Sequence, residues 1–429
     1  MAATCDPEYL QALLDVEVAL AVAEAEAGVI PAAAVPEIRA AARAELYDAN
    51  ALALEAINDG NIVIPLVRKL TDAVRARNAD AARHVHRGAT SQDIMDTALV
   101  LRLRAAGASL LESLTQAMRS AATLAREHAS TPMPGRTWLQ HASPTTFGLK
   151  CAGWLDMIGR CNERLGQAID RAQVLQLGGA SGTLASLGAA GPIVADTMAN
   201  ALALRVPAMP WHTHRDRIVD VASALGITCG ALGKVGRDLT LLAQSEVAEV
   251  AEQRGGGSSS MPHKQNPVHA VIAVAAAVRA PGLVATMLSA MPQEHERAAG
   301  GWQAEWQTLA DLVSITRESA TAIAVALGGL RIDAERMRSN LDLHGGVAMA
   351  EALAVALTPH TGRADAMAHV QRLSRAVADD GGSLRDHAAS DAEVSRLLSP
   401  ADIDRALDPA QFLGSAGVYI ERVLQQWGV

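Results

Sequence analysis

Aromatic side chains make up only 3% of this 429-residue chain. Hydrophobic residues nevertheless reach 50% of the sequence, so the core must be filled mainly by Ala, Val and Leu. Such side chains suit closely packed helices better than sheets. A charged fraction of 19% beside this apolar content is typical of a globular protein and excludes a disordered regulator.

Cysteine is scarce, and acidic side chains outnumber basic ones. The four cysteines, Cys5, Cys151, Cys161 and Cys229, have no CxxC spacing, which argues against a disulfide scaffold or a structural zinc site. The net charge of −9 disfavours a nucleic-acid binder. No signal-peptide pattern opens the sequence, and the longest uninterrupted apolar run, Ala270 to Val278, is too short to span a bilayer. We therefore expect a soluble, cytoplasmic protein that binds neither nucleic acid nor membrane.

Proline is missing from long stretches of the chain. The proline-free windows lie between Pro65 and Pro132, Pro144 and Pro192, Pro210 and Pro262, and Pro292 and Pro359. Because proline inside a helix costs about 3 kcal/mol, these windows are where long helices can run. The first window carries apolar residues at steps of three and four, as a helical stripe requires. No strand–helix alternation typical of a parallel sheet is found, so the fold class is predicted to be all-α.

The pattern of helices and breaks predicts three parts. Residues 1–92 hold shorter helices, residues 93–338 hold the long helices, and residues 339–429 hold short helical segments broken by proline and glycine. Long helices that are apolar on more than one face usually pack against neighbours, including those of other subunits.

One loop between two long helical stretches, residues 255–267, reads GGGSSSMPHKQNP. It resembles a flexible Gly/Ser linker at its start, but a linker has no need of the polar run that follows. Successive N–H groups of a Gly/Ser turn with a lysine nearby can form an anion-stabilising nest. We therefore favour a functional loop. It does not match the nucleotide-binding P-loop pattern.

Three strings in this order resemble the signatures of the fumarase/aspartase superfamily. They are GATSQDIMDTA (88–98), GRTWLQHASPTTFG (135–148) and GSSSMPHKQNP (257–267). The resemblance covers nearly the whole chain. It implies a three-part helical fold whose long central helices form a twenty-helix core in a homotetramer, with active sites shared between subunits. It also implies an enzyme that needs no cofactor or metal and acts on a small polycarboxylate.

Trp138 points to one branch of that superfamily. Fumarases and adenylosuccinate lyases have His after GRT, whereas GRTWLQHA is similar to the bacterial 3-carboxy-cis,cis-muconate cycloisomerases. These convert a muconate tricarboxylate to a lactone, 4-carboxymuconolactone, in the β-ketoadipate pathway of protocatechuate degradation. Run backwards, the reaction expels a carboxylate, whose pKa near 4 lets it leave without a proton. Expelling hydroxide or an amine benefits from a general acid, so Trp138 suits the lactone chemistry better.

The resemblance also implies roles for individual residues. Ser258 is the expected proton carrier, and Lys264 is expected to stabilise its alkoxide. The expected substrate-binding residues are Thr90, Ser91, Trp138, Gln140, His141, Asn266 and Arg297. Plainer interpretations stay open: Thr90 and Ser91 as helix N-caps, His141 as a core histidine, and Arg297 as an exposed ion-pair partner.

Two His-x-His pairs, His84–His86 and His212–His214, do not have a convincing metal-ligand spacing. His86 matches a histidine that precedes the first signature in the adenylosuccinate-lyase branch, so it is expected near the site. Gly178 and Gly179 lie in a segment too short for a dinucleotide fingerprint, and we expect a turn there.

Three residues depart from the cycloisomerase pattern. Gln265 stands where Arg is common, His214 where Gln is common, and His344 where Thr is usual. They leave room for a substituted muconate, or for a lyase of the same superfamily that releases fumarate from adenylosuccinate or another succinyl compound. A non-catalytic helical scaffold is a third hypothesis, disfavoured by the intact loop.

Overall fold

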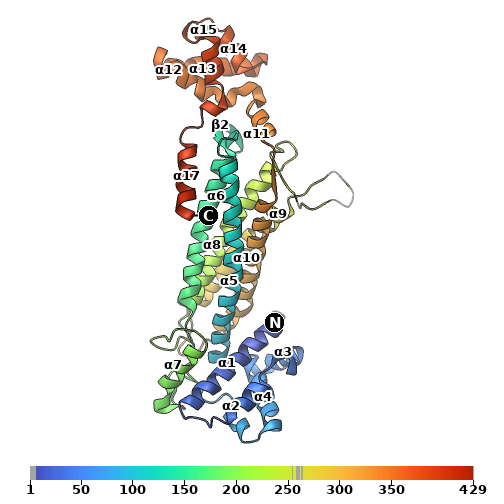
Figure 1. The fold of residues 1–429 in the computed structure, drawn as a ribbon, viewed down its shortest axis with the longest axis vertical. Coiled ribbons are helices and arrows are strands. Elements are labelled where there is room, and N and C mark those ends of the chain that lie inside the picture. The colour runs from blue at the N-terminus through green and yellow to red at the C-terminus, as the bar shows by residue number, and fades with distance from the viewer. Residues whose placement is uncertain (1–5, 254, 258–260, 262–263, 429) are drawn as a thin grey trace. The chain divides into compact units, whose positions relative to one another are not determined.

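The computed structural model describes residues 6–253, 255–257, 261 and 264–428. They are mainly helical (Figure 1), which confirms the predicted all-α class. The long helices are α5 (Ser91–Glu127), α6 (Phe147–Ala172), α8 (Asp216–Leu242), α9 (Val268–Ala290) and α10 (Gly301–Gly328). Four of them lie in the proline-free windows. The exception is α9, which contains Pro281.

Shorter helices precede and follow the long ones. The N-terminal helices are α1 (Pro7–Glu26), α2 (Ala34–Ala41), α3 (Ala49–Asp59) and α4 (Val63–Arg77), and α7 (Gly191–Ala201) lies between α6 and α8. The C-terminal helices are α11 (Ala334–Leu341), α12 (Ala350–Thr361), α13 (Arg363–Asp380), α14 (Leu384–Ser390), α15 (Val394–Leu397), α16 (Pro400–Ala406) and α17 (Ala416–Trp427). Between α11 and α12, the 3₁₀ segment η5 (Leu343–Met349) has left-handed backbone at His344, Gly345 and Gly346.

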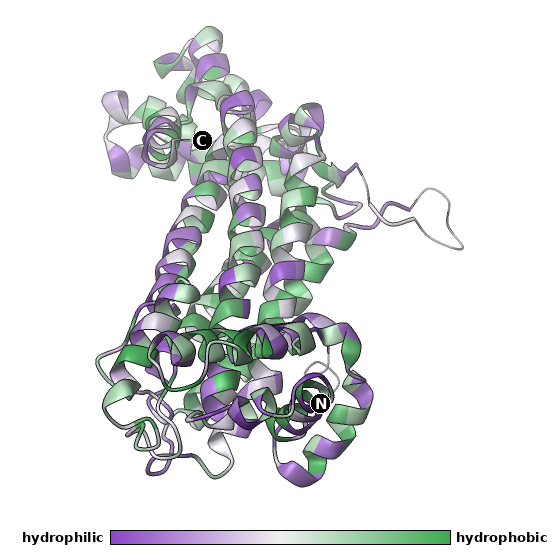
Figure 2. Cartoon of the chain, turned by 60° about the horizontal axis from the view of Figure 1, so that its bottom comes forward, coloured by the Kyte–Doolittle hydropathy of each residue, from purple (hydrophilic) through white to green (hydrophobic). Residues whose placement is uncertain are grey.

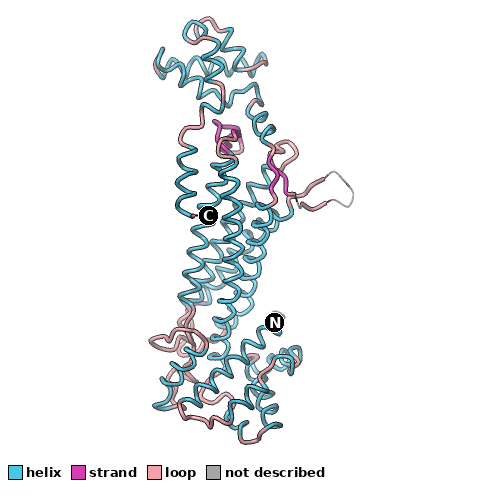
Figure 3. Tube along the Cα trace, in the orientation of Figure 1, coloured by secondary structure: helices cyan, strands magenta, loops and turns pink. Residues whose placement is uncertain are grey.

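Two small antiparallel sheets interrupt the helices (Figure 3). One is a hairpin of β1 (Pro132–Thr137) and β2 (Gln140–Thr146), and the other pairs β3 (Val250–Glu252) with β4 (Leu330–Ile332). The sequence did not predict them, because strands of three to seven residues carry little periodicity. Both sheets carry or flank the segments singled out for function.

The chain folds into two compact units, each built from three separate stretches. Unit 1 comprises Met1–Glu112, Cys161–Gly230 and Ala276–Arg317, and unit 2 comprises Ser113–Arg160, Ala231–Ala275 and Glu318–Val429. The division into residues 1–92, 93–338 and 339–429 stays a prediction. Each unit is described by itself below.

Unit 2 has an apolar cluster of its own near the C-terminus. It is built by α12 to α16 and includes the buried side chains Leu353, Leu357, Val370, Leu373, Leu384, Val394 and Ile403. The last helix, α17, packs on α6. There the Trp427 indole N–H donates to Asp156 (3.1 Å), and the ring covers Gly159, where a Cβ would lie only 2.5 Å from it.

Among the described residues two helices, α8 and α9, are long and apolar enough to cross a membrane, by length and composition alone. The bent pair formed by α11 and residues 343–361 also meets this criterion when it is taken as one span. In α9, Arg279 interrupts the apolar run that begins at Ala270 but leaves the helix as a whole apolar. In α8, 67% of the apolar window is buried inside the chain, but in α9 only 22% is. Figure 2 shows hydrophobic residues interspersed with hydrophilic ones along the long helices.

Candidate active site

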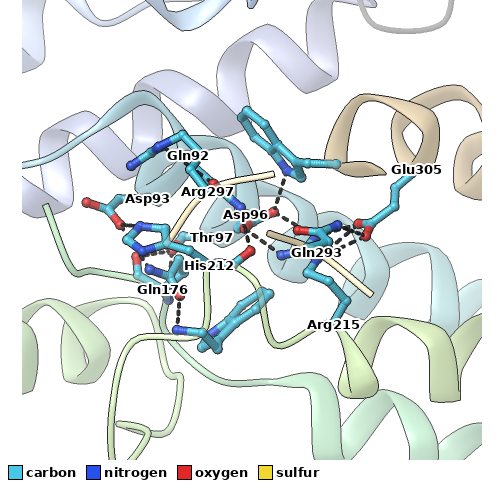
Figure 4. A network of polar contacts seen from close by, with 12 residues as sticks. Gln92, Asp93, Asp96, Thr97, Gln176, His212, Arg215, Gln293, Arg297 and Glu305 are labelled. Carbon is cyan, nitrogen blue, oxygen red and sulfur yellow. Dashed lines mark hydrogen bonds and ion pairs between the residues drawn. The ribbon is translucent and has the colours of Figure 1, made fainter. Parts of the chain in front are cut away.

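Asp93 is the centre of a buried polar cluster in unit 1 (Figure 4). It lies in the first turn of α5, and its carboxylate accepts hydrogen bonds from the nearby Thr90 and from groups more than 80 residues away in sequence. The donors are the Gln176 side chain (3.0 Å), the backbone N–H groups of Gly178 (3.0 Å), Gly179 (2.8 Å) and Thr90 (2.9 Å), and the His212 ring, whose Nε2 lies at 2.7 Å. The Gly178–Gly179 turn is therefore fixed against the start of α5. Gly178 must lack a side chain, because a Cβ there would lie 2.7 Å from Pro210 and 2.8 Å from His212.

A second buried cluster lies one turn further along α5. Arg215, at the start of α8 and fully buried, donates to both oxygens of Asp96 (2.7 and 3.0 Å) and to Glu305 on α10 (2.6 to 3.1 Å). Burial by itself would lower the pKa of Arg215, but the two carboxylates raise it. Burial raises the pKa of Glu305, although Arg215 opposes that shift. The cluster therefore links α5, the start of α8 and α10 at the first signature.

Arg297 reaches the N-terminal end of α5. Its guanidinium donates to the carbonyl of Ala180 (3.0 Å) and lies 3.5 Å from the side-chain oxygen of Gln92. The amide nitrogen of Gln92 donates in turn to Asp96 (3.0 Å) and to the His212 carbonyl (2.8 Å), as Figure 4 shows. Within the described part of the chain Arg297 has no carboxylate partner, so the expectation of a surface ion pair is not met.

Unit 1 therefore brings together three of the expected substrate-binding residues. Ser91 is the first residue of α5, and Thr90 directly precedes it. The Arg297 guanidinium lies beside the side chain of Gln92, the second residue of the helix. A long helix presents unsatisfied N–H groups and a partial positive charge at its N-terminus. With Arg297 beside it, this end of α5 has the properties of a carboxylate site.

In unit 2 the second signature forms the β1–β2 hairpin. Trp138 and Leu139 are its two-residue turn, with φ angles of 53° and 64°, as a tight hairpin turn requires. Trp138 projects from the tip and is 97% exposed, whereas Gln140 and His141 follow on β2. The rings of His141 and His344 make an edge contact with centroids 6.4 Å apart. Burial, and then the charge of Arg136, lower the pKa of His141.

The third signature belongs to the segment between β3 and α9. Ser258, the expected proton carrier, lies outside the described residues. Asn266 pairs with Gly256 through two backbone hydrogen bonds (2.9 and 3.0 Å) and closes the base of the loop, while Lys264 is exposed. Glu252 anchors the segment that follows, because its carboxylate accepts from the backbone N–H groups of His269 (3.2 Å) and Ala270 (2.9 Å) at the start of α9.

Several residues that organise the site were not singled out from the sequence. Asp93, Glu249 and Glu252 are buried carboxylates that anchor the three signature segments. Gln265, one of the departures, accepts a hydrogen bond from Arg331 on β4 (2.5 Å), so a cation lies beside the loop even without an arginine at position 265. Among the described residues no three His, Cys, Asp or Glu side chains are grouped to hold a metal ion.

Comparisons with known proteins identify the family. A lyase family model matches residues 3–282, and an adenylosuccinate lyase C-terminal model matches residues 346–423. This chain belongs to that lyase family, the fumarase/aspartase superfamily. Within it, the resemblance to the bacterial 3-carboxy-cis,cis-muconate cycloisomerases is confirmed by a relative from Pseudomonas aeruginosa of that name, 50% identical over 98% of this chain and 92% of the relative.

A solved structure and a second relative add to this assignment. The 3-carboxy-cis,cis-muconate lactonizing enzyme from Pseudomonas putida has a TM-score of 0.93 and 45% identity, covering 98% of this chain and 95% of its own. The fold is therefore that of the superfamily, as predicted. A nitrosuccinate lyase from Streptomyces davaonensis is 41% identical over 99% of this chain and 91% of the relative.

Proposed function

We propose that this protein is a cycloisomerase that converts 3-carboxy-cis,cis-muconate to its lactone. The observation that carries the proposal is the 50% identity to the Pseudomonas aeruginosa enzyme over almost the entire chain. In this reaction one substrate carboxylate adds across a conjugated double bond, and a proton is delivered to the carbon next to another carboxylate. The protein must hold several negative charges although its own net charge is −9.

The end of α5 supports one part of this chemistry. Arg297 donates only to uncharged acceptors among the described residues, so its charge stays available to a substrate carboxylate. The N-terminus of α5, which begins at Ser91 directly after Thr90, adds a partial positive charge. We propose that these groups bind one carboxylate of the substrate.

We further propose that Ser258 carries the proton and that Lys264 stabilises its alkoxide. A serine hydroxyl is a poor base by itself and needs a nearby cation and N–H donors. The exposed Lys264 and the closed loop base at Gly256 and Asn266 are consistent with this role. Trp138, Gln140 and His141 are proposed to line the substrate site from the exposed hairpin.

A spectrophotometric assay tests this function. Wild-type protein is expected to remove the conjugated-diene absorbance of 3-carboxy-cis,cis-muconate, and Ser258→Ala to lose at least about a thousandfold in rate, as removal of a catalytic nucleophile or base does. Ser259→Ala and Ser260→Ala are the matched controls on the same loop and should retain activity. A wild-type protein that leaves the diene unchanged would refute the cycloisomerase assignment.

A fumarate-releasing lyase is the second candidate, because the relatives include a nitrosuccinate lyase and a fumarate lyase. Adenylosuccinate and other succinyl compounds should then yield fumarate. Trp138→His discriminates between the two: it supplies a general acid that helps a poor leaving group and gives no benefit to lactone formation.

We also propose that the protein is a cytoplasmic homotetramer in which copies cover α9 and share active sites. Val271, Val278 and Leu288 on α9 are 53%, 74% and 50% exposed, and an apolar helix so exposed needs a partner. Analytical ultracentrifugation should give a tetramer, and Val278→Glu should dissociate it. Val418→Glu on α17, where the side chain is 52% exposed, is the control and should not.

A further inference from the structure

A buried acidic pair on α1 faces the segment just before the first signature. Glu17 and Glu24 lie seven residues apart, two helical turns, and both are buried with exposed fractions of 2% and 0%. Buried carboxylates without a partner are costly, so each demands an explanation. Neither residue belongs to the signatures from which the active-site residues were predicted.

The partner of Glu17 is His86. The His86 Nδ1 lies 2.7 Å from Glu17 Oε1, with the Glu17 side chain 1% exposed and the His86 side chain 18% exposed. Among the described residues the other ring nitrogen, Nε2, makes no hydrogen bond. His86 has a left-handed backbone, with φ 56°, so the ring is held there against a conformational preference.

The electrostatics around the ring favour a positive charge on His86. Burial by itself would lower the pKa of His86, but Glu17, Asp93 on α5 and Glu24 together raise it. Burial raises the pKa of Glu24 to about 8, although the charge of the neighbouring Arg87 opposes this shift. Glu24 is therefore protonated at neutral pH. The carboxyl groups facing His86 are therefore Glu17, Asp93 and Glu24, and Arg87 is the neighbouring cation.

We propose that Glu17 is a positioning residue of the active site. Its carboxylate accepts the hydrogen bond of the His86 Nδ1–H and so fixes the orientation of the ring. The Nε2–H on the other side of the ring then donates to an anionic group of the substrate beside Thr90 and Ser91. The inference rests on the proposed function, since it assigns a second cation to the carboxylate site at the start of α5. Glu17 itself touches no substrate and acts through His86.

Glu17→Gln removes the charge while keeping the shape of the side chain. We expect KM to rise about tenfold near neutral pH with kcat within about threefold, because the imidazolium that binds substrate is no longer favoured. The rise of KM on the alkaline side should begin about one pH unit lower than in the wild type. Glu17→Asp keeps the charge and should recover part of the loss.

Glu24→Gln is the matched control. It changes a carboxyl on the same buried face of α1, two turns away, and imitates the protonated form that Glu24 has at neutral pH. KM near neutral pH should therefore equal that of the wild type. The inference is wrong, and Glu17 is only structural, if Glu17→Gln and Glu24→Gln change KM alike. The same holds if the KM of Glu17→Gln begins to rise at the same alkaline pH as that of the wild type.

A binding measurement separates this inference from the proposed reaction. Propane-1,2,3-tricarboxylate, which cannot form the lactone, is titrated calorimetrically into wild type, Glu17→Gln and Glu24→Gln over a range of pH. Selective weakening in Glu17→Gln supports the inference even if the wild type proves inactive on carboxymuconate. Equal affinities, or no binding to a wild type that turns over carboxymuconate, would refute the assigned role.

Discussion

Arg136 and Glu249 form a bidentate ion pair across 113 residues of sequence, with N–O distances of 2.9 and 2.6 Å. Arg136 belongs to the second signature on β1, and Glu249 directly precedes β3, from which the third signature emerges. The Glu249 side chain is 0% exposed and also accepts from Asn340 at 2.8 Å. Within unit 2, one carboxylate thus links the β1–β2 hairpin of the second signature to the segment that precedes the third signature.

Glu249→Gln should destabilise the protein by about 2–4 kcal/mol, because it leaves the largely buried Arg136 guanidinium without a charged partner. Urea unfolding of the two proteins gives the difference. Glu351→Gln serves as control, since its bond to Ser143 on β2 is exposed and should contribute little. Equal losses for the two variants would mean that the buried pair has no special role.

Asp93→Asn should cost about 3 kcal/mol or more and raise KM. The carboxylate accepts from five donors, and an amide nitrogen in its place would face N–H groups. The turn at Gly178–Gly179, and with it Ala180 and Arg297, would lose its anchor. Urea unfolding and steady-state kinetics measure both effects. A variant of normal stability and KM would contradict this role for Asp93.

Glu24→Gln should stabilise the protein at alkaline pH and have little effect in acid. The folded-state pKa of Glu24 is raised from 4.5 to about 8 by burial, so the folded protein binds a proton that the unfolded chain releases between these values. The stability associated with this carboxyl is therefore fully present below about pH 4.5 and is lost as pH rises through about 8. The gain for the variant near pH 8 should be a few kcal/mol at most, measured by urea unfolding at several pH values. A constant difference across that range would contradict the assignment.

Gly88→Ala should be more destabilising than Gly60→Ala. Both glycines have left-handed backbone, with φ 79° and 80°, which costs about 1 kcal/mol for alanine. At Gly88 the new Cβ would also lie 2.5 Å from Leu187, adding about 1–3 kcal/mol, whereas nothing lies within 4 Å at Gly60. Thermal unfolding compares the two. Because Gly88 lies three residues before Ser91, the first residue of α5, only its variant should also raise KM.

The sequence by itself determined the fold class, the family and the expected chemistry. The proline-free windows located α5, α6, α8 and α10, because proline disfavours a helix interior. The signature strings identified the superfamily, and Trp138 pointed to the cycloisomerase branch, since a carboxylate leaving group needs no acid.

Only the tertiary structure decided which buried carboxylates hold these segments. Asp93, Glu249 and Glu17 find partners 69 to 119 residues away, and no local pattern encodes pairing at that distance. In the sequence Glu17 is one of five acidic residues in α1, with nothing to distinguish it from the others. Its pairing with His86 follows from burial. Burial removes water, so the carboxylate depends on the donor that the fold supplies.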